Sequence, residues 1–409
     1  MSDGFALGTL VPNNMSLPVQ RALGDVEEAH GDIDAYVTRE LGYENKEAMH
    51  EAFAGEQVDA LGMALNNIAQ GKGLVLGDQT GIGKGRVCAG IIRWAKKQGK
   101  IPVFVTMMPD LYVDMLRDLE DTRTPFRPFL TNQSLRGKDA LTLPDGSKLS
   151  SLPKKKYDEA LKRLLSGELP EDCDGIFTTY NQLSGKAGEP RRRLLKALNE
   201  NVVFILDEAH NAGGPDSNVG QFVREIMAEN PNGALYSSAT YAKRPDIMSL
   251  YNKTDLSLIG NSQEDLEETM RTGGLAMQQV VSAMLTESGQ YIRREKSFEG
   301  ATMETVTAGV DLKMADEMAD SMSAIMEVSL ELGPALEKLD KALKREGRTA
   351  RENGSTGTAG ASSTTFSSVM HNLVAQTTLA IKADAAVEAV KKAVKADQKP
   401  VITLSNTMG

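Results

Sequence analysis

The feature that most constrains the fold is a glycine-rich decapeptide directly after a short apolar run. Leu74–Leu76 precede residues 77–86, which read GDQTGIGKGR. Glycine allows positive φ and lets phosphate oxygens approach backbone N–H groups, which point outward at the start of a helix. Residues 87–96 then carry apolar side chains at helical spacing. The order of strand, loop and helix predicts a phosphate-binding loop, although an ordinary turn between a strand and a helix has the same local pattern.

Lys84 is the loop residue that we expect to contact the β and γ phosphates of a nucleotide. The loop departs from the consensus at Asp78, where glycine or alanine is usual, and at Gly85, where Ser or Thr normally ligates Mg²⁺. Either Asp207 and water hold the metal, with help from a side chain such as Thr80, or turnover is slow. The loop residues that we assign to nucleotide binding are Thr80, Gly81, Ile82, Gly83, Lys84, Gly85 and Arg86.

A second predicted strand ends in paired carboxylates. Val202–Leu206 is an apolar run typical of a strand buried on both faces, and the letters DEAH follow at 207–210. An unpartnered carboxylate is costly to bury, so its presence at such a strand end favours a site. We expect Asp207 to bind Mg²⁺ and Glu208 to act as the general base toward water. His210 would link the nucleotide site to the other side of the cleft; the alternatives are a solvated strand end and a structural histidine.

A third predicted strand precedes a motif of small hydroxyl residues. The apolar residues 234–236 lead into Ser238, Ala239 and Thr240. Hydroxyl groups at this point can hydrogen-bond the acidic motif and report the nucleotide state to the substrate side, so we predict a coupling role. The tripeptide is common by itself, and its place after the acidic motif is what supports the prediction.

Together these motifs resemble helicase superfamily two, and more narrowly the strawberry notch-like helicases and ATPases of eukaryotes, bacteria and phages. The narrower resemblance rests on the glycine after the lysine in GDQTGIGKGR and on segments 106–121, 177–180, 206–214 and 291–298. It implies an α/β fold, a RecA-like P-loop NTPase domain with a central, mostly parallel sheet and helices on both faces. It also implies ATP and Mg²⁺ as cofactors, nucleic acid (DNA is expected) as the partner, and hydrolysis coupled to translocation or remodelling. Gln57, near the start of a helix, resembles the superfamily's adenine-reading glutamine, although a surface glutamine fits the sequence equally well.

The resemblance and the composition divide the chain into four segments. We predict a helical lead-in at 1–50, a RecA-like motor domain at 51–300, a helical extension at 301–398 with a flexible loop at 346–368, and the first strand of a second RecA-like domain at 399–409. In such motors the second domain supplies arginines that stabilise charge on the γ phosphate. A chain that stops there should bind nucleotide but hydrolyse it weakly, whether it is a fragment of a longer phage or bacterial protein or a natural short form.

The charge distribution limits the partners. The formal net charge is −10, which argues against a general polyanion binder. Basic patches at 154–156, at 191–193 and at Arg293, Arg294 and Lys296 are either solvated faces or a phosphate track. An alternative function stays open, that of a nucleotide-dependent interaction, phage packaging or virion protein that binds partners without translocating.

The rest of the sequence gives few signals. The two cysteines, Cys88 and Cys173, have no metal-binding spacing. We find neither the pattern of a signal peptide nor an apolar run long enough to span a bilayer, and we expect no membrane partner. The expected location is the cytoplasm of a bacterial or phage-infected cell, with a virion as the other possibility. Residues 124–174 read as a polar insertion with loops around a helix at 157–165.

Overall fold

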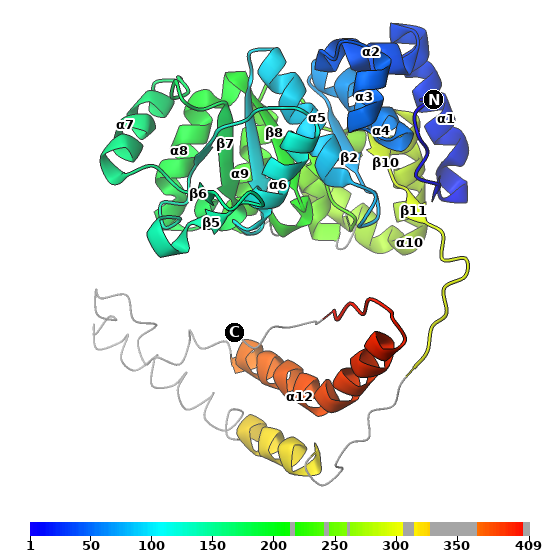
Figure 1. The fold of residues 1–409 in the computed structure, drawn as a ribbon, viewed down its shortest axis with the longest axis vertical. Helices are drawn as coiled ribbons and strands as arrows, with labels where there is room; N and C mark the ends of the chain where they lie inside the picture. The colour runs from blue at the N-terminus through cyan, green and yellow to red at the C-terminus, as the bar shows by residue number, and fades with distance from the viewer. Residues whose placement is uncertain (213–216, 241–244, 260–261, 306–314, 328–365, 404–409) are drawn as a thin grey trace. The chain divides into compact units, whose positions relative to one another are not determined.

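The structure is a computed structural model, and it describes the chain except for residues 213–216, 241–244, 260–261, 306–314, 328–365 and 404–409. The chain divides into two compact units, Met1–Glu299 and Gly300–Gly409. The first unit contains the main sheet and all the residues predicted to form the nucleotide site (Figure 1). The site can therefore be described from this unit alone.

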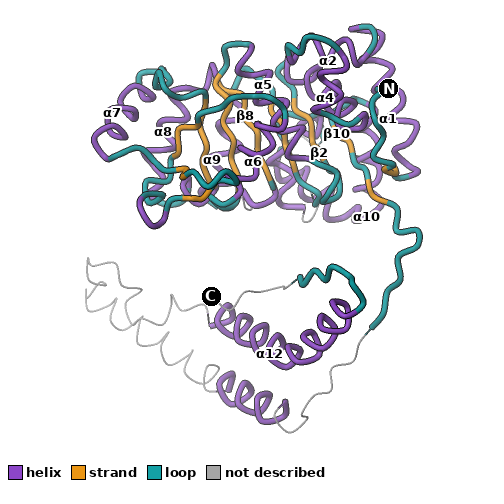
Figure 2. Tube along the Cα trace, in the orientation of Figure 1, coloured by secondary structure: helices purple, strands orange, loops and turns teal. Residues whose placement is uncertain are grey.

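A seven-stranded parallel sheet forms the centre of the first unit, with its strands drawn in orange in Figure 2. Ser237 lies opposite both Leu76 and Asp207, so three of the strands end at the same level. The carboxyl ends of parallel strands share one edge, which is where α/β proteins place ligand sites. The predicted RecA-like α/β fold is confirmed. The strands, in spatial order, are β10 (Tyr291–Ile292), β2 (Gly73–Leu76), β9 (Ala234–Ser237), β8 (Val202–Asp207), β3 (Ile101–Thr106), β7 (Gly175–Thr179) and β4 (Pro128–Leu130).

Helices cover both faces of this sheet (Figure 1). One face packs against α1 (Asn13–His30), α2 (Ile33–Leu41), α3 (Lys46–Ala52), α4 (Gly55–Ala69), α5 (Lys84–Lys97) and α6 (Leu111–Asp121). The other packs against α7 (Lys154–Leu165), α8 (Glu189–Leu198), α9 (Asn218–Glu229) and α10 (Gln263–Glu287). Short 3₁₀ helices are η1 (Gly137–Asp139), η2 (Tyr180–Leu183), η3 (Lys186–Gly188), η4 (Asn199–Asn201), η5 (Ala209–Ala212), η6 (Pro245–Tyr251) and η7 (Asp255–Leu258).

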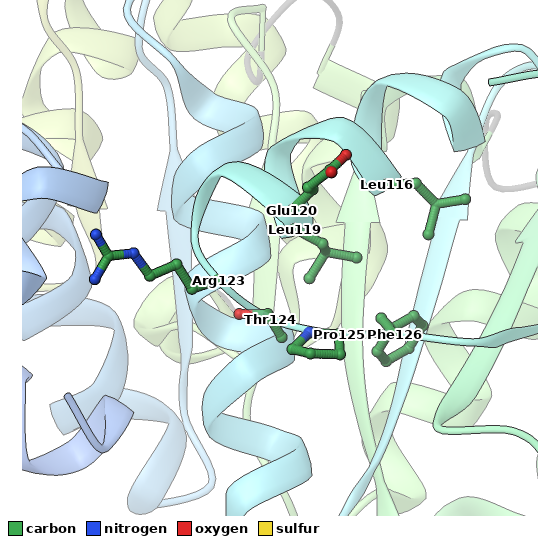
Figure 3. A pocket seen from close by; sticks show the side chains of 7 residues that line it. All are labelled: Leu116, Leu119, Glu120, Arg123, Thr124, Pro125 and Phe126. Carbon is green, nitrogen blue, oxygen red and sulfur yellow. The ribbon is translucent and has the colours of Figure 1, made fainter. Parts of the chain in front are cut away.

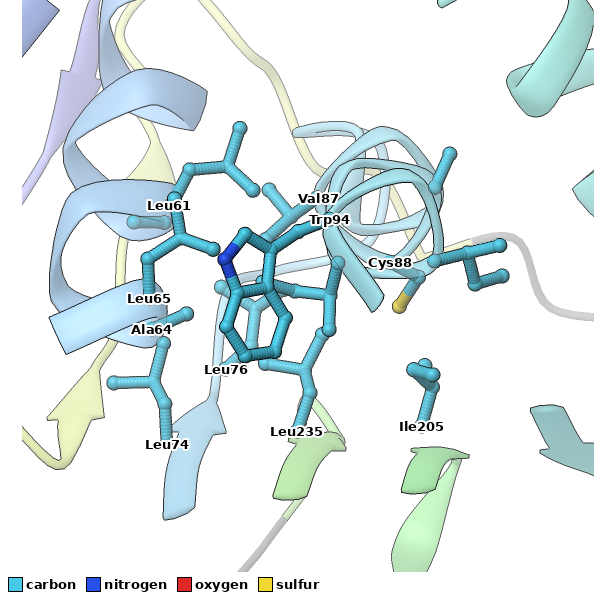
Figure 4. Close-up of a cluster of buried hydrophobic side chains, with 14 of the residues drawn as sticks. Leu61, Ala64, Leu65, Leu74, Leu76, Val87, Cys88, Trp94, Ile205 and Leu235 are labelled. Carbon is cyan, nitrogen blue, oxygen red and sulfur yellow. The ribbon is translucent and has the colours of Figure 1, made fainter. Parts of the chain in front are cut away.

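The core consists of two apolar clusters, one on each face of the sheet. Along β8, Val203 and Ile205 belong to one cluster, whereas Phe204 and Leu206 belong to the other. This alternation follows from the two-residue period of a strand, and it explains why a strand covered on both faces reads as a continuous apolar run. Figure 4 shows part of the cluster that contains Val203 and Ile205, in which Trp94 of α5 lies among leucines of α4 and β2. Burial of such side chains contributes about 25 cal/mol per Å² and fixes α5 on the sheet.

The polar stretch at 124–174 contains a strand that the sequence did not predict. Pro128–Leu130 forms β4 at the edge of the main sheet, paired in parallel with β7. The prediction missed it because a strand of three residues gives too short a pattern to distinguish from a loop. The same stretch also carries a small antiparallel pair, β5 (Leu141–Thr142) and β6 (Lys148–Leu149).

The first ten residues run as an extended strap over α4, held by carboxylates of that helix. Leu7 N and Thr9 N donate to Glu56, and Ser2 N donates to Asp59 Oδ1 at 2.8 Å. The strap ends in β1 (Thr9–Leu10), which pairs antiparallel with β11 (Glu295–Lys296). Residues 1–50 therefore belong to the same compact unit as the sheet.

Asp59 should make the stability of the first unit depend on pH. Burial raises the pKa of Asp59 from 3.8 to about 6, so the folded state holds a proton that the unfolded state releases between these values. The free energy of unfolding should therefore fall as pH rises from 4 to 6. Asp59→Asn removes this penalty and should raise the free energy of unfolding at pH 7 by up to about 3 kcal/mol.

Urea unfolding followed by the fluorescence of Trp94, the single tryptophan, measures this effect at pH 4.5 and pH 7. The exposed Asp25 of α1 provides the control, because Asp25→Asn should leave both values unchanged. Equal stability of Asp59→Asn and the unmodified chain at pH 7 would contradict the assignment.

The second unit contains helix at residues 315–327 and α12 (Phe366–Lys395). The loop expected at 346–368 lies outside the described residues apart from its last three, which begin α12. Residues 399–403 form no strand, and 404–409 lie outside the described residues, so the opening strand of a second motor domain stays a prediction. None of the described helices is both long and apolar enough to cross a membrane.

Candidate nucleotide-binding site

The glycine-rich loop lies between β2 and the first turn of α5, as predicted. Gly81 and Gly83 both have φ of +92°, a left-handed conformation that favours glycine. Lys84 begins α5, and its ammonium donates to the backbone carbonyl of Asp78 at 2.8 Å. The lysine thus folds back over the loop, where a phosphate oxygen could replace the carbonyl as its partner.

A buried ion pair fastens this loop to the segment that directly follows strand β10. Arg294 donates from Nε to Asp78 Oδ1 at 3.1 Å and from a terminal nitrogen to Oδ2 at 2.5 Å, and also to the carbonyl of Glu56. The side chains of Asp78 and Arg294 are 1% and 3% exposed. Main-chain bonds add to this contact, because Gly77 N donates to Ile292 O and Gln79 N to Arg294 O.

This contact corrects the interpretation of Arg294 as part of an exposed basic patch. Arg294 is an internal partner of the loop, whereas its neighbour Arg293 is 45% exposed and pairs with Glu295. The pair also accounts for Asp78 at a position where glycine or alanine is usual. The patch at 191–193 is partly internal as well, since Arg191 and Arg192 donate to backbone carbonyls.

Asp207 ends β8 at the same edge of the sheet, held by a hydroxyl on each side. Thr106 Oγ1 donates to Asp207 Oδ2 at 3.0 Å and Ser237 Oγ to Oδ1 at 3.1 Å. Burial raises the pKa of Asp207, while the two hydroxyls and Lys84 oppose this rise. Thr106 and Ser237 were not predicted as site residues, although each is the last residue of a strand adjacent to β8.

Glu208 follows in a left-handed conformation, with φ of +46°. A non-glycine residue in this region costs of order 1–3 kcal/mol and persists only where its surroundings fix it. Burial raises the pKa of Glu208, the negative charge of Asp207 raises it further, and Lys84 lowers it. A carboxylate with a raised pKa is a stronger base, which suits proton abstraction from water.

His210 connects the acidic motif to the hydroxyl motif. Its Nδ1 lies 3.4 Å from Glu208 Oε2, 2.8 Å from Ser238 Oγ and 3.3 Å from Thr240 Oγ1. Ser238 is buried and Thr240 is exposed, so the connection runs from the interior to the surface. There, Ala239 and Thr240 line a cavity of about 560 Å³ together with Arg293 and residues of α1 and α10.

Gln57 is buried beneath the glycine-rich loop. Its Nε2 donates to Ile82 O at 3.1 Å, and its Oε1 accepts from Ala54 N at 3.0 Å at the start of α4. A Cβ at Gly83 would collide with this Nε2, so the glutamine and the glycine fit each other. Gln57 thus lies beside the loop, as its predicted role requires, with its amide bonded to backbone groups.

The other loop residues differ in their surroundings. Thr80 and Gly81 are exposed at the tip, while Ile82 is buried. Arg86 points away from the loop, because its guanidinium donates to Ala52 O at 2.7 Å and to Asp121 at 2.6 Å. The structure therefore brings Lys84 and the loop backbone to the edge of the sheet, but engages Arg86 elsewhere.

The residues at this edge fit a Mg²⁺ ion that is bound mainly through a nucleotide. Within the part of the chain that the structure describes, no group of three or more His, Cys, Asp or Glu residues could hold a metal ion alone. Mg²⁺ in NTPase sites is commonly held by one or two carboxylates, phosphates and water. The buried carboxylate of Asp207 meets this requirement, because a cation would relieve the cost of its burial.

Another cavity, of about 410 Å³, lies at the end of α6 (Figure 3). It is mainly apolar and contains none of the residues of the glycine-rich loop or the acidic motif, so we assign it no part in nucleotide binding. Its lining is Leu116, Leu119, Glu120, Arg123, Thr124, Pro125 and Phe126.

Comparison with known proteins places this site in a family. The family model described as "P-loop containing NTP hydrolase pore-1" matches residues 45–320. The chain belongs to this family. The match includes the glycine-rich loop, the acidic motif and the hydroxyl motif, and the strawberry notch-like character predicted for this P-loop domain is confirmed.

Curated relatives of this P-loop NTP hydrolase include several strawberry notch proteins. Protein FORGETTER 1 of Arabidopsis thaliana is 27% identical over 66% of the chain and 20% of its own length. Strawberry notch homolog 2 of Mus musculus is 28% identical over 57% of the chain and 16% of its length. The strawberry notch homolog of Caenorhabditis elegans is 25% identical over 82% of the chain and 17% of its own length. The chain thus spans about a fifth or less of these relatives.

Solved structures with partial similarity were also found. The SWI2/SNF2 ATPase core of Sulfolobus solfataricus in complex with dsDNA is 19% identical, with a TM-score of 0.42, and the match covers 60% of this chain and 45% of that one. A nuclease-deletion mutant of a Type ISP restriction-modification enzyme is 22% identical, with a TM-score of 0.30 over 46% and 17%.

Proposed function

We propose that this P-loop NTP hydrolase is an ATP-binding motor domain that couples ATP hydrolysis to translocation along, or remodelling of, nucleic acid, with DNA as the expected substrate. The observation that carries the proposal is the position of His210, whose Nδ1 contacts both Glu208 and the Ser238–Thr240 motif. A change at Glu208, where the nucleotide would bind, could therefore reach the exposed Thr240 through this one histidine.

Each residue then has a distinct role toward ATP. The loop backbone at 80–85 would surround the phosphates, and Lys84 would exchange the carbonyl of Asp78 for the β and γ phosphates. Asp207 would hold Mg²⁺, which supplies charge neutralisation on the phosphates when bound. Glu208 would take a proton from the attacking water, and Gln57 would contact the adenine after its amide leaves Ile82 O.

Nucleic acid would bind near Thr240, at the exposed end of the contacts made by His210. The cavity beside Ala239 and Thr240 presents the partly exposed Arg293, a donor suited to phosphate oxygens. A second RecA-like domain, which the strawberry notch-like character implies, would complete the ATP site in a longer protein. The domain in this chain would then supply nucleotide binding and the base, and would hydrolyse ATP slowly by itself.

Reciprocal binding tests this proposal without requiring fast turnover. If ATP and DNA are coupled, MgATP should change the affinity for an oligonucleotide by about 5- to 150-fold, and DNA should change the affinity for MgATP by the same factor. Fluorescence anisotropy of labelled single-stranded and duplex oligonucleotides, with and without MgATP, measures this factor. Ser238→Ala should reduce the factor while leaving MgATP affinity unchanged, because it removes the hydroxyl that bonds His210.

The control for that variant is Ser249→Ala, since Ser249 is also buried but its hydroxyl has no partner among the described residues. It should leave the coupling unchanged. The motor function would be contradicted if the chain binds MgATP tightly but its affinity for the oligonucleotide is the same with and without MgATP. That result would favour the alternative of a nucleotide-dependent interaction protein.

A further inference from the structure

Gly85 of the loop faces a carboxylate of the neighbouring helix. A Cβ built at Gly85 would collide with Asp118 Oδ2 of α6 and lie 3.1 Å from its Cγ. P-loops carry Ser or Thr at this position, and its hydroxyl ligates Mg²⁺. The Asp118 carboxylate therefore occupies the space in which that hydroxyl side chain would begin.

Asp118 is poorly compensated for a charge in this location. Its side chain is 17% exposed, and among the described residues its ion pair is with Arg117 at 3.9 Å, longer than a charge-assisted hydrogen bond. Burial raises the pKa of Asp118; Arg117 and Arg86 lower it, and two acidic neighbours raise it further. Arg86 is itself engaged by Asp121 at 2.6 Å. A partly buried carboxylate without a close partner carries a desolvation cost, and a bound cation would reduce that cost.

The thiol of Cys88 in α5 is close enough to both Asp118 and Asp207 for each charge to affect its pKa. Cys88 is fully buried one turn after Lys84, and burial raises the pKa of its thiol. The charges of Asp207 and Asp118 both raise that pKa further, while Lys84 lowers it. Asp118 and Asp207 are thus both near the buried thiol of Cys88, on the helix that follows the glycine-rich loop.

We propose that Asp118 replaces the absent P-loop hydroxyl and is, with Asp207, the second protein oxygen group toward the Mg²⁺ that accompanies the nucleotide, directly or through one water. The inference rests on the proposed binding of MgATP. A carboxylate differs from a hydroxyl in its negative charge, so it opposes the phosphates when the metal is absent and attracts the metal when it is present. The chain should consequently prefer MgATP over metal-free ATP more strongly than a P-loop with Ser or Thr.

Titration of the full chain with a fluorescent ATP analogue, in Mg²⁺ and in EDTA, measures this preference as a ratio of dissociation constants. Asp118→Ala should reduce the ratio by about tenfold or more, the effect of losing one charge-assisted ligand. Asp114→Ala is the matched control, because Asp114 lies one turn earlier on α6, is 52% exposed and also pairs with Arg117. It should leave the ratio within about twofold.

A compensating variant separates metal ligation from simple packing. Gly85→Ser alone should weaken MgATP binding, because the new side chain meets the Asp118 carboxylate. Gly85→Ser combined with Asp118→Ala should restore the Mg²⁺ preference toward that of the unmodified chain, since the serine hydroxyl takes the vacated place. Electron paramagnetic resonance of Mn²⁺ with ATP should show the same order of affinities, independently of hydrolysis.

Each outcome decides a different point. Equal ratios for Asp118→Ala and Asp114→Ala, or a double variant no better than Asp118→Ala, would overturn the role of Asp118 and leave the proposed function intact. Absence of nucleotide binding by the unmodified chain would overturn both. Trp94 fluorescence in urea verifies folding, and if Asp118→Ala unfolds, Asp118→Asn keeps the shape of the side chain and removes its charge.

Discussion

Glu208→Gln is expected to lower the rate of ATP hydrolysis by about 10²- to 10⁴-fold, the usual contribution of a general base. Glutamine keeps the shape of the side chain but cannot accept the proton of water. The affinity for MgATP should stay within about threefold, because we expect Lys84 and the loop backbone to provide most of the binding. Single-turnover phosphate release detects the slow rates involved, and the fluorescent ATP titration gives the affinity.

The same residue should determine the acidic side of the pH–rate profile. Burial and Asp207 raise the pKa of Glu208, so the base becomes protonated at a higher pH than an ordinary glutamate. Hydrolysis should therefore decline as pH falls through that raised pKa, and this decline should disappear from the residual activity of Glu208→Gln. Glu229→Gln, at an exposed position at the end of α9, is the control. A glutamine variant as active as this control would exclude Glu208 as the base.

Arg294→Met is expected to lower the free energy of unfolding of the first unit by about 3–5 kcal/mol, because it leaves the charge of Asp78 buried without a partner. It should also weaken MgATP binding, since the backbone carbonyl of Asp78 accepts the hydrogen bond that positions Lys84. Urea unfolding followed by Trp94 fluorescence gives the loss of stability, and the ATP titration gives the loss of affinity.

Two further variants make the cause of that loss clear. Arg293→Met removes the adjacent, partly exposed arginine and should cost no more than about 1 kcal/mol. Asp78→Asn combined with Arg294→Met removes both charges and should recover part of the stability that Arg294→Met loses. A loss for Arg294→Met no larger than that for Arg293→Met would show that the ion pair contributes little.

The fold and the main loops could be predicted because their signals are local. An apolar run followed by glycines or carboxylates identifies a buried strand and the loop after it, and this was sufficient for β2, β8 and β9. Three residues of β4 in a polar stretch gave no comparable pattern. The boundaries of the helical extension and the catalytic roles stay predictions, because the described residues and the comparisons do not test them.

The missed features depend on contacts between distant parts of the sequence. Arg294 looked like part of a basic patch because its partner, Asp78, lies 216 residues away. Thr106 and Ser237 can be recognised as partners of Asp207 only once the strand order is known, because β3 and β9 lie on either side of β8. The left-handed backbone of Glu208 is set by its surroundings, so the letters DEAH do not disclose it.

The path of the chain after β10 has a mechanical consequence. Ile292 and Arg294 bond the backbone of the glycine-rich loop, and a few residues later the chain passes through β11 and leaves the first unit at Glu299. Tension applied beyond that point would pass first through the pairing of β11 with β1 and next through the bonds that hold Gly77 and Gln79. Whatever pulls on the segment after Glu299 would thus load the glycine-rich loop as well.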